Sequence, residues 1–284
     1  MGNESRDFGP TETNLHLDCP TLRRFEKTWE QKTSWKPHLA IGAAMSEGLA
    51  TYLSNPCEEG LVKALASAEA VLTDRVPGNS EEWSLEGLKT LVSNGIESAA
   101  ETTLAEMLKT EKVVGTEVSI GSGRIDLVTA PRIVTELSSS IVAHSNPLSE
   151  DYLIITDHKT SIQKAPRYIE SDFKDIPLNW QLWDYAWRAQ SYYGRPVRWI
   201  RIHQIILSPR TKCIMSEPSR INPENLKMWE LNASITWKDM QSDDQFPFEI
   251  LRQNWHHCLN KYGPCRAYQA CHSFLRDEKQ MESV

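Results

Sequence analysis

Apolar and polar positions follow two different patterns along the chain, and the change falls near residue 112. Before it, apolar side chains recur every three or four residues, which is the spacing of an amphipathic helix. This spacing predicts helices over residues 20–29, 39–53, 60–73 and 82–110. After it, short apolar runs that are typical of strands predominate. They predict strands over 112–120, 123–129, 152–156 and 197–207, with helices over 177–193 and 222–240.

This order of elements determines the fold class that we expect. Helices come first, strands with one embedded helix follow, and a helix comes last, which is typical of a mixed α/β core with a helical N-terminal flank. The run 152–156 is apolar throughout, so it is expected to be a central strand. The stretch 131–150 is expected to be a long connection. Residues 1–12 are polar and contain Gly and Pro, and we expect them to be disordered.

The composition excludes several classes of protein. Of 284 residues, 40% are apolar and 24% are charged, as in ordinary soluble globular proteins. No apolar run approaches the roughly 20 residues of a membrane span, and the N-terminus has no apolar core of a secretory signal. We therefore expect a cytoplasmic protein without a membrane partner. The net charge of −7 argues against a protein that coats nucleic acid by bulk charge, but not against a local basic groove.

Two aspartates and a lysine are the first candidates for chemistry. Asp126 and Asp157 each follow an apolar run, so both are expected at strand ends, where they would meet at one edge of the sheet. Lys159 points to the same face as Asp157 in an extended segment. Mg²⁺ and Mn²⁺ prefer carboxylate and carbonyl oxygens, and the carbonyl of His158 is a further candidate ligand. A single Asp-x-Lys, however, is more often a surface ion pair.

A second polar pair follows on the predicted helix 177–193. Gln181 and Tyr185 are four residues apart and share one helix face, from which they could orient the lysine and a phosphate. The tryptophans on this helix, Trp180, Trp183 and Trp187, favour packing over stacking on a nucleic-acid base. Together the motifs read Gly123-x-x-Asp126, Asp157-x-Lys159 and Gln181-x-x-x-Tyr185.

In this order, the three motifs resemble the RecB-type branch of the PD-(D/E)XK nuclease superfamily. The resemblance covers nearly the whole chain, from Cys19 to Cys271. It implies a restriction-endonuclease-like core, in which helices flank a central mixed β-sheet, and DNA cleavage that depends on Mg²⁺ or Mn²⁺. It also assigns catalytic roles by position, and the residues concerned are Asp126, Asp157, Lys159, Gln181 and Tyr185.

The chain departs from the family at one position. The family carries a histidine metal ligand in a Gly-x-x-x-His pattern on an early helix, and Gly42 to Ser46 places Ser46 there. A serine hydroxyl is a weak ligand, so the departure bears on metal affinity or activity. Glu117 resembles a supporting acidic position of some members, and Arg124 is a second supporting candidate.

The cysteines predict a second metal site. Cys258, Cys265 and Cys271 are closely spaced, which in a cytosolic protein favours metal over disulfides. A fourth ligand from His256, His257 or His272 would give a zinc site, and Cys19 would give four thiolates suited to iron and sulfur. Unliganded buried thiols are the alternative to both.

The resemblance to RecB-type nucleases favours an iron–sulfur cluster over a zinc site. One subgroup of RecB-type nucleases, which includes the helicase–nuclease subunit AddB and the CRISPR-associated adaptation nucleases, has one Cys-Pro near its start and three cysteines at its end. Cys19, Cys258, Cys265 and Cys271 match that layout, which implies a 4Fe–4S cluster that staples the two ends together; Zn²⁺ is the alternative.

The sequence thus predicts a standalone nuclease domain over residues 13–275, with tails at 1–12 and 276–284. Its expected parts are a helical flank (13–110), a catalytic core (111–215) and a helical closure with the Cys-rich end (216–275). We expect an exonuclease that acts on DNA ends or single strands in recombination, repair or processing, in a bacterial or phage context. The alternatives are a catalytically weak or inactive DNA-binding subunit, and a zinc-stapled structural protein. Homo-oligomers or recombination-complex partners are compatible with each.

Overall fold

The computed structural model describes residues 37–76, 83–132, 151–162, 165–208 and 210–245, together with positions 8, 13, 16, 17, 19, 20, 23, 259, 260, 263 and 264. The chain divides into two compact units. One runs from Thr33 to Pro223, and the other combines Met1–Lys32 with Glu224–Val284. That both belong to one domain over 13–275 stays a prediction.

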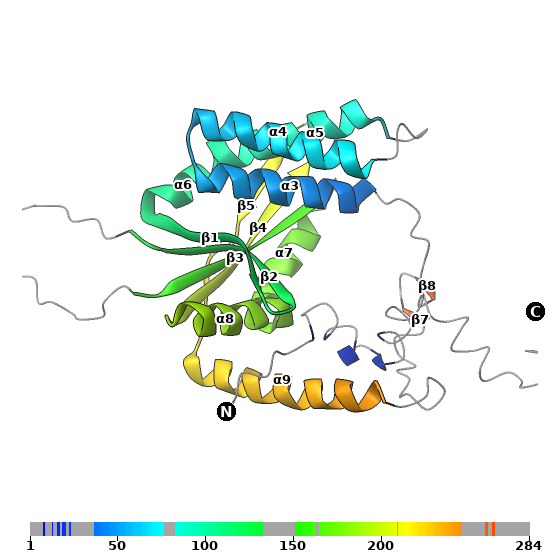
Figure 1. Ribbon diagram of the computed structural model, residues 1–284, viewed down its shortest axis with the longest axis vertical. Helices are drawn as coiled ribbons and strands as arrows, with labels where there is room; N and C mark the ends of the chain where they lie inside the picture. The colour runs from blue at the N-terminus through cyan, green and yellow to red at the C-terminus, as the bar shows by residue number, and fades with distance from the viewer. Residues whose placement is uncertain are drawn as a thin grey trace, which may run out of the picture. The chain divides into compact units, whose positions relative to one another are not determined.

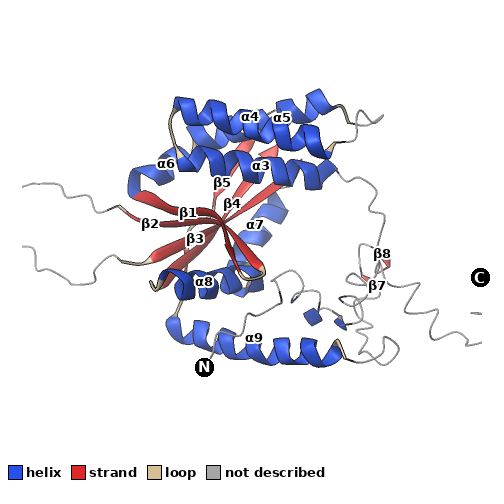
Figure 2. Ribbon diagram, viewed as in Figure 1, coloured by secondary structure: helices blue, strands red, loops and turns tan. Residues whose placement is uncertain are grey.

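A mixed β-sheet forms the centre of the larger unit. Its strands are β1 (Glu111–Ile120), β2 (Gly123–Pro131), β3 (Leu153–Ile162), β4 (Val197–Leu207), β5 (Lys212–Met215) and β6 (Ser219–Arg220). The order is β1-β2-β3-β4-β5, and β6 pairs with the beginning of β4. β3 and β4 are parallel, whereas the other pairs are antiparallel. The predicted fold class, a central mixed sheet flanked by helices, is therefore confirmed (Figure 2).

Helices cover both faces of this sheet (Figure 1). On one face lie α3 (Pro37–Ser54), α4 (Glu58–Arg75), α5 (Leu85–Glu101) and α6 (Thr103–Thr110). The crossover from β3 to β4 contains α7 (Pro166–Lys174), the 3₁₀ turn η1 (Ile176–Leu178) and α8 (Trp180–Tyr193), and α8 packs on the opposite face. The main apolar core joins α3–α6 to Leu127, Ile205 and Leu207 of the sheet. No helix among the described residues has the length and apolar character that crossing a membrane requires.

Local signals set the ends of the helices that hold the site. Ser84 caps α5 by accepting a hydrogen bond from the backbone N–H of Gly87, at 3.0 Å. Asn179 caps α8 in the same way through the N–H of Leu182, at 3.2 Å. α8 ends at Gly194, which has φ +63°, a left-handed conformation that glycine adopts without steric cost.

Several predicted boundaries are wrong. The helix expected over 82–110 begins at Leu85 and is broken at Thr102 into α5 and α6. The strand expected over 152–156 extends to Ile162, so Asp157 lies inside β3 rather than at its end. Asp126 likewise lies inside β2. The two carboxylates therefore share a face in the middle of the sheet and not its edge.

The smaller unit is built on α9 (Pro223–Asp243), with β7 (Leu259–Asn260) paired to β8 (Gly263–Pro264). Positions near the N-terminus pack against this helix. The indole N–H of Trp237 donates to Thr13 at 3.1 Å, and buried Arg23 donates to the carbonyl of Met240 and pairs with Asp244. The two ends of the chain thus meet in one unit.

Candidate active site

Strand register brings the two predicted carboxylates together. Leu127 of β2 is opposite Thr156 of β3, so their neighbours Asp126 and Asp157 share the other face of the sheet, toward α8. Asp157 is buried and Asp126 is half-buried, and the backbone N–H of His158 donates to Asp126 Oδ2 at 2.7 Å. The two strands thus hold two acids side by side beneath one helix.

Lys159 lies on the same face, as its spacing from Asp157 predicts. Its Nζ is 2.8 Å from Asp157 Oδ2, and it donates to Gln181 Oε1 at 3.1 Å. The lysine side chain is 37% exposed whereas that of Asp157 is 2% exposed, so the ammonium group lies between the buried acid and solvent. A cation in this position can contact both the acid and a group that arrives from solvent.

Gln181 connects α8 to the sheet. Its amide Nε2 donates to Tyr185 Oη at 2.6 Å and reaches Asp157 Oδ1 at 3.4 Å. One side chain therefore contacts Lys159, Tyr185 and Asp157, and all five predicted catalytic residues form a single connected group. Their individual roles stay predictions.

Burial and mutual repulsion make the acids hard to ionise. Burial, followed by the charge of Asp157, raises the pKa of Asp126 to about 8. Burial also raises the pKa of Asp157, although Lys159 acts in the opposite direction. Burial raises the pKa of the Tyr185 hydroxyl as well, so this group stays protonated and can donate a hydrogen bond. Two adjacent acids with raised pKa values favour either a proton or a cation between them.

The donor set fits a hard divalent cation. Mg²⁺ binds through one or two carboxylates together with water and substrate phosphate oxygens, and Asp126 and Asp157 supply two such carboxylates. No group of three or more His, Cys, Asp or Glu side chains that could hold a metal is found among the described residues. Backbone carbonyl, water and phosphate oxygens are the further donors that such a cation accepts. The His158 carbonyl stays a predicted ligand.

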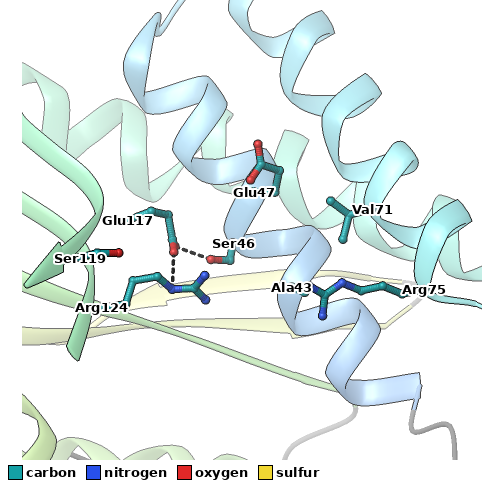
Figure 3. Close-up of a pocket in the computed structure, with 8 residues that line it drawn as sticks. All are labelled: Ala43, Ser46, Glu47, Val71, Arg75, Glu117, Ser119 and Arg124. Carbon is teal, nitrogen blue, oxygen red and sulfur yellow. Dashed lines mark hydrogen bonds and ion pairs between the residues drawn. The ribbon is translucent and has the colours of Figure 1, made fainter. Parts of the chain in front are cut away.

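Ser46, which stands at the family's histidine position, and Glu117, the supporting acidic position, lie in contact with each other. The Ser46 hydroxyl on α3 donates a short hydrogen bond to Glu117 Oε1, and Arg124 Nε is 2.8 Å from Glu117 Oε2 (Figure 3). Glu117 has φ 49°, which is uncommon for a residue other than glycine. Its charge also contributes to the raised pKa of Asp126. Ser46 thus contacts the residue whose charge acts on Asp126.

The sequence did not reveal the buried pair Asp184 and Arg188, which supports the site from α8. Arg188 Nε donates to Asp184 Oδ2 at 2.6 Å, and Arg188 Nη1 donates to the carbonyl of Ile120 at 2.9 Å, at the turn between β1 and β2. A Cβ at Gly123 would lie 2.9 Å from Arg188 Cδ and Nε. The glycine of the Gly-x-x-Asp motif thus leaves space for this arginine. The four-residue spacing of Asp184 and Arg188 was the available signal.

A separate polar network occupies the opposite face of the same strands. Arg201 makes two hydrogen bonds to Glu111, at 2.8 and 2.7 Å, and a third to Thr156 at 2.8 Å. His158 Nδ1 lies 3.0 Å from His203 Nδ1, and burial lowers the pKa of both imidazoles, to about 4 for His158. Both rings are therefore neutral, and one donates to the other.

Two of the arginines that could have formed a local basic groove have structural roles instead. Arg201 is buried on Glu111, and Arg23 is 2% exposed on α9, so neither is available to a phosphate. The indole N–H of Trp183, one of the three tryptophans for which packing is favoured over stacking, donates to the carbonyl of Pro177 at 2.9 Å.

Cys19 is buried in the smaller unit, and its carbonyl accepts from the N–H of Arg23 at 3.1 Å. Its predicted partners Cys258, Cys265 and Cys271, and the alternative ligands His256, His257 and His272, lie outside the described residues.

Comparison with known proteins gives distant likenesses in structure alone. No family model matches the chain, and no curated protein matches it. The fold is similar to the crystal structure of a candidate exonuclease from Eubacterium rectale, with TM-score 0.48 and 10% identity over 94% of this chain and 88% of that one.

Proposed function

We propose that the chain is a metal-dependent DNA nuclease, and that it hydrolyses phosphodiester bonds as an exonuclease on DNA ends or single strands. The observation that carries the proposal is the connected group of Asp126, Asp157, Lys159, Gln181 and Tyr185 on one face of the sheet. The choice of DNA as substrate rests on the resemblance of these motifs to RecB-type nucleases.

Each residue of the group has its own proposed role in hydrolysis. Asp126 and Asp157, with the His158 carbonyl, are the proposed ligands of Mg²⁺ or Mn²⁺, which when bound polarises the phosphate and makes water a stronger nucleophile. Lys159 holds the attacking water and stabilises negative charge that develops on the phosphate. Gln181 fixes the direction of the lysine through the 3.1 Å hydrogen bond. The protonated hydroxyl of Tyr185 keeps Gln181 in place.

Cleavage of end-labelled DNA tests the proposal. Single- and double-stranded substrates labelled at the 5′ or the 3′ end are incubated with Mg²⁺, with Mn²⁺ and with EDTA. We expect metal-dependent cleavage by the wild type, and a loss of about 100-fold or more in Lys159→Ala, because removal of one charge-stabilising donor costs roughly that much. A protein that cuts none of these substrates with either metal would refute the proposal.

One observation favours a second function. Ser46 occupies the position of the family histidine and is engaged by Glu117, so the metal would have one protein ligand fewer than in the family. The second candidate is therefore a catalytically silent DNA-binding or assembly subunit. It predicts DNA binding that persists without metal and without cleavage. Ser46→His separates the two, because a gain of cleavage or of Mn²⁺ affinity supports the enzyme.

We further propose that Cys19, Cys258, Cys265 and Cys271 hold a 4Fe–4S cluster that staples the ends of the chain. In support, Cys19 belongs to the unit in which both ends of the chain meet. Anaerobically purified protein should be brown, with a broad visible absorption from thiolate-to-iron charge transfer and about four iron atoms per chain. Colourless protein that contains zinc would favour the zinc site instead.

A further inference from the structure

A cavity of about 320 Å³ lies beside the candidate active site, between α3, α4 and the β1–β2 hairpin (Figure 3). Ligand sites in proteins begin at about 300 Å³, so this cavity suits one small polar unit and not a protein segment. Two arginines, Arg75 and Arg124, and two serines, Ser46 and Ser119, belong to its lining. Positive charge together with hydroxyl donors is the chemistry that recognises a phosphate.

The two arginines differ in what already holds them. Arg124 is 61% exposed and is ion-paired to Glu117, at 2.8 Å. Arg75, in the last turn of α4, is exposed and has no hydrogen bond or ion pair with any residue that the structure describes. In Figure 3 their side chains extend toward α3 from β2 and from α4. Arg75 thus presents its full set of donors to whatever enters the cavity.

The cavity is connected to the catalytic carboxylates through β2 and Glu117. Arg124 and Asp126 are two residues apart in β2, so their Cα atoms are separated by about 7 Å. Glu117 lines the cavity and belongs to the same β1–β2 hairpin as Asp126. A nucleic-acid strand that has its scissile phosphate at Asp126 and runs along β2 toward Arg124 would reach the cavity within about one nucleotide.

We propose that this cavity binds one phosphate of the substrate strand next to the bond that is cut, and that Arg75 and Arg124 are its anion contacts. The proposal rests on the proposed nuclease function and adds a residue, Arg75, that none of the sequence motifs contains. Two acids also line the cavity, Glu47 and Glu117. Glu117 is already ion-paired with Arg124 and accepts a hydrogen bond from Ser46, so Glu47 is the acid whose charge would repel a bound phosphate.

Removing a positive or a negative charge from the cavity should change DNA binding in opposite directions, which tests the proposal. Binding of a fluorescent single-stranded oligonucleotide is measured by anisotropy in the full chain, with Ca²⁺ in place of Mg²⁺ and the DNA checked on a gel to be uncut. Arg75→Gln should weaken binding about five- to tenfold and lower the slope of log K against log salt by about 0.7. Glu47→Gln should have the opposite effect and tighten binding, because it removes a like charge beside the bound phosphate.

Lys63→Gln provides the matched control. It removes one positive charge from the same helix, where Lys63 is 62% exposed and pairs only with Glu59 in the described part of the chain. Equal binding by Arg75→Gln and Lys63→Gln, or weaker binding by Glu47→Gln, would overturn the proposal. Either result would leave Arg75 with only the ordinary role of a basic residue at a helix C-terminus.

Three oligonucleotides distinguish the source of the phosphate: one with a 5′-phosphate, one with a 3′-phosphate and one with hydroxyls at both ends. An Arg75→Gln effect of equal size on all three identifies an internal phosphodiester, and an effect confined to one identifies the phosphate of that end. The same DNA incubated with Mg²⁺ or Mn²⁺ separates this proposal from the proposed function. Cleavage by the wild type without an Arg75→Gln effect on binding refutes the cavity alone. An Arg75→Gln effect without any cleavage refutes the nuclease alone.

Discussion

The two faces of the sheet carry two buried polar groups that differ in how their charges are balanced. Toward α6, Glu111 and Arg201 form a closed pair in which one negative charge meets one positive charge through two hydrogen bonds. Toward α8, Asp126 and Asp157 share one partly exposed lysine, Lys159. The same strands support both groups, because successive side chains alternate between the faces.

The difference separates a network that is complete in itself from the group that we propose to be functional. A buried charge is tolerated when it is paired and hydrogen-bonded, and the Glu111–Arg201 pair needs nothing further. Two adjacent acids beside one lysine, with Asp157 buried and Asp126 half-buried, are maintained by the fold at a cost in free energy. Perturbed pKa values of this kind cluster at functional sites. Four experiments test this comparison.

The largest effect is expected on the α8 face, where Asp157→Asn should lower the rate of DNA cleavage by about a thousandfold or more. The substitution removes one of the two proposed metal ligands. It also removes a charge from a repelling pair, so thermal stability without metal should stay the same or rise. Single-turnover cleavage and thermal unfolding of the same preparation measure both. A variant that cleaves normally would show that the group is merely structural.

On the other face, Glu111→Gln should lower the stability of the fold and leave DNA cleavage almost unchanged. It leaves the Arg201 guanidinium buried without a counter-charge, which costs about 3–5 kcal/mol of unfolding free energy. Cleavage per folded molecule should stay near the wild-type value. Urea unfolding followed by circular dichroism gives the stability, and activity is normalised to the folded fraction. A selective loss of cleavage in a stable Glu111→Gln protein would contradict the division between the faces.

The pH dependence of stability should follow Asp126. Its folded pKa is about 8, whereas an unfolded aspartate titrates near 4, so the folded chain holds an extra proton between these values. Its contribution to stability is therefore greatest near pH 4 and is lost as the pH rises toward 8. Thermal unfolding in EDTA measures this fall, and Asp126→Asn should remove it. Mg²⁺ or Mn²⁺ should raise Tm most near pH 8, where it replaces the lost proton.

The smallest effect is expected from a pair of glycine substitutions. Gly123→Ala places a methyl group 2.9 Å from the buried Arg188 side chain and should cost about 1–3 kcal/mol. Gly42→Ala, in α3, meets nothing within 4 Å and should stabilise the protein by about 0.5–1 kcal/mol. Tm measurements compare the two. Equal shifts would mean that Arg188 moves aside freely, and that the hairpin is not held by α8.

Much of this site could be read from the sequence because its spacing rules are local. Two-residue spacing placed Lys159 beside Asp157, and four-residue spacing placed Gln181 beside Tyr185. The helix expected over 39–53 and the strand over 197–207 were recovered as α3 and β4 for the same reason, since each repeats one period over many residues.

The parts that were missed depend on contacts distant in sequence. The end of β3 could not be predicted because Lys159 to Ile162 is polar for a central strand, and pairing with β4 extends it. The short helix α7 has few apolar positions, and the sequence did not predict it. Glu111, Thr156 and Arg201 each looked like ordinary polar residues, and only the sheet register reveals them as one network. The cavity lined by Arg75 likewise requires three-dimensional packing of α3 and α4 on the hairpin.

The parallel pairing of β3 with β4 also determines the order in which parts of the sheet fold. The β1–β2 hairpin can form directly from its turn at Gly121, whereas a parallel pair forms only when its whole connection is in place. α8 belongs to that connection, so Gln181 meets Asp157 only after this long loop has closed. We therefore expect amide protons of β1 and β2 to gain protection from hydrogen exchange early in refolding, and those of α8 to gain it late. A newly synthesised chain would complete most of its scaffold before its reactive groups come together.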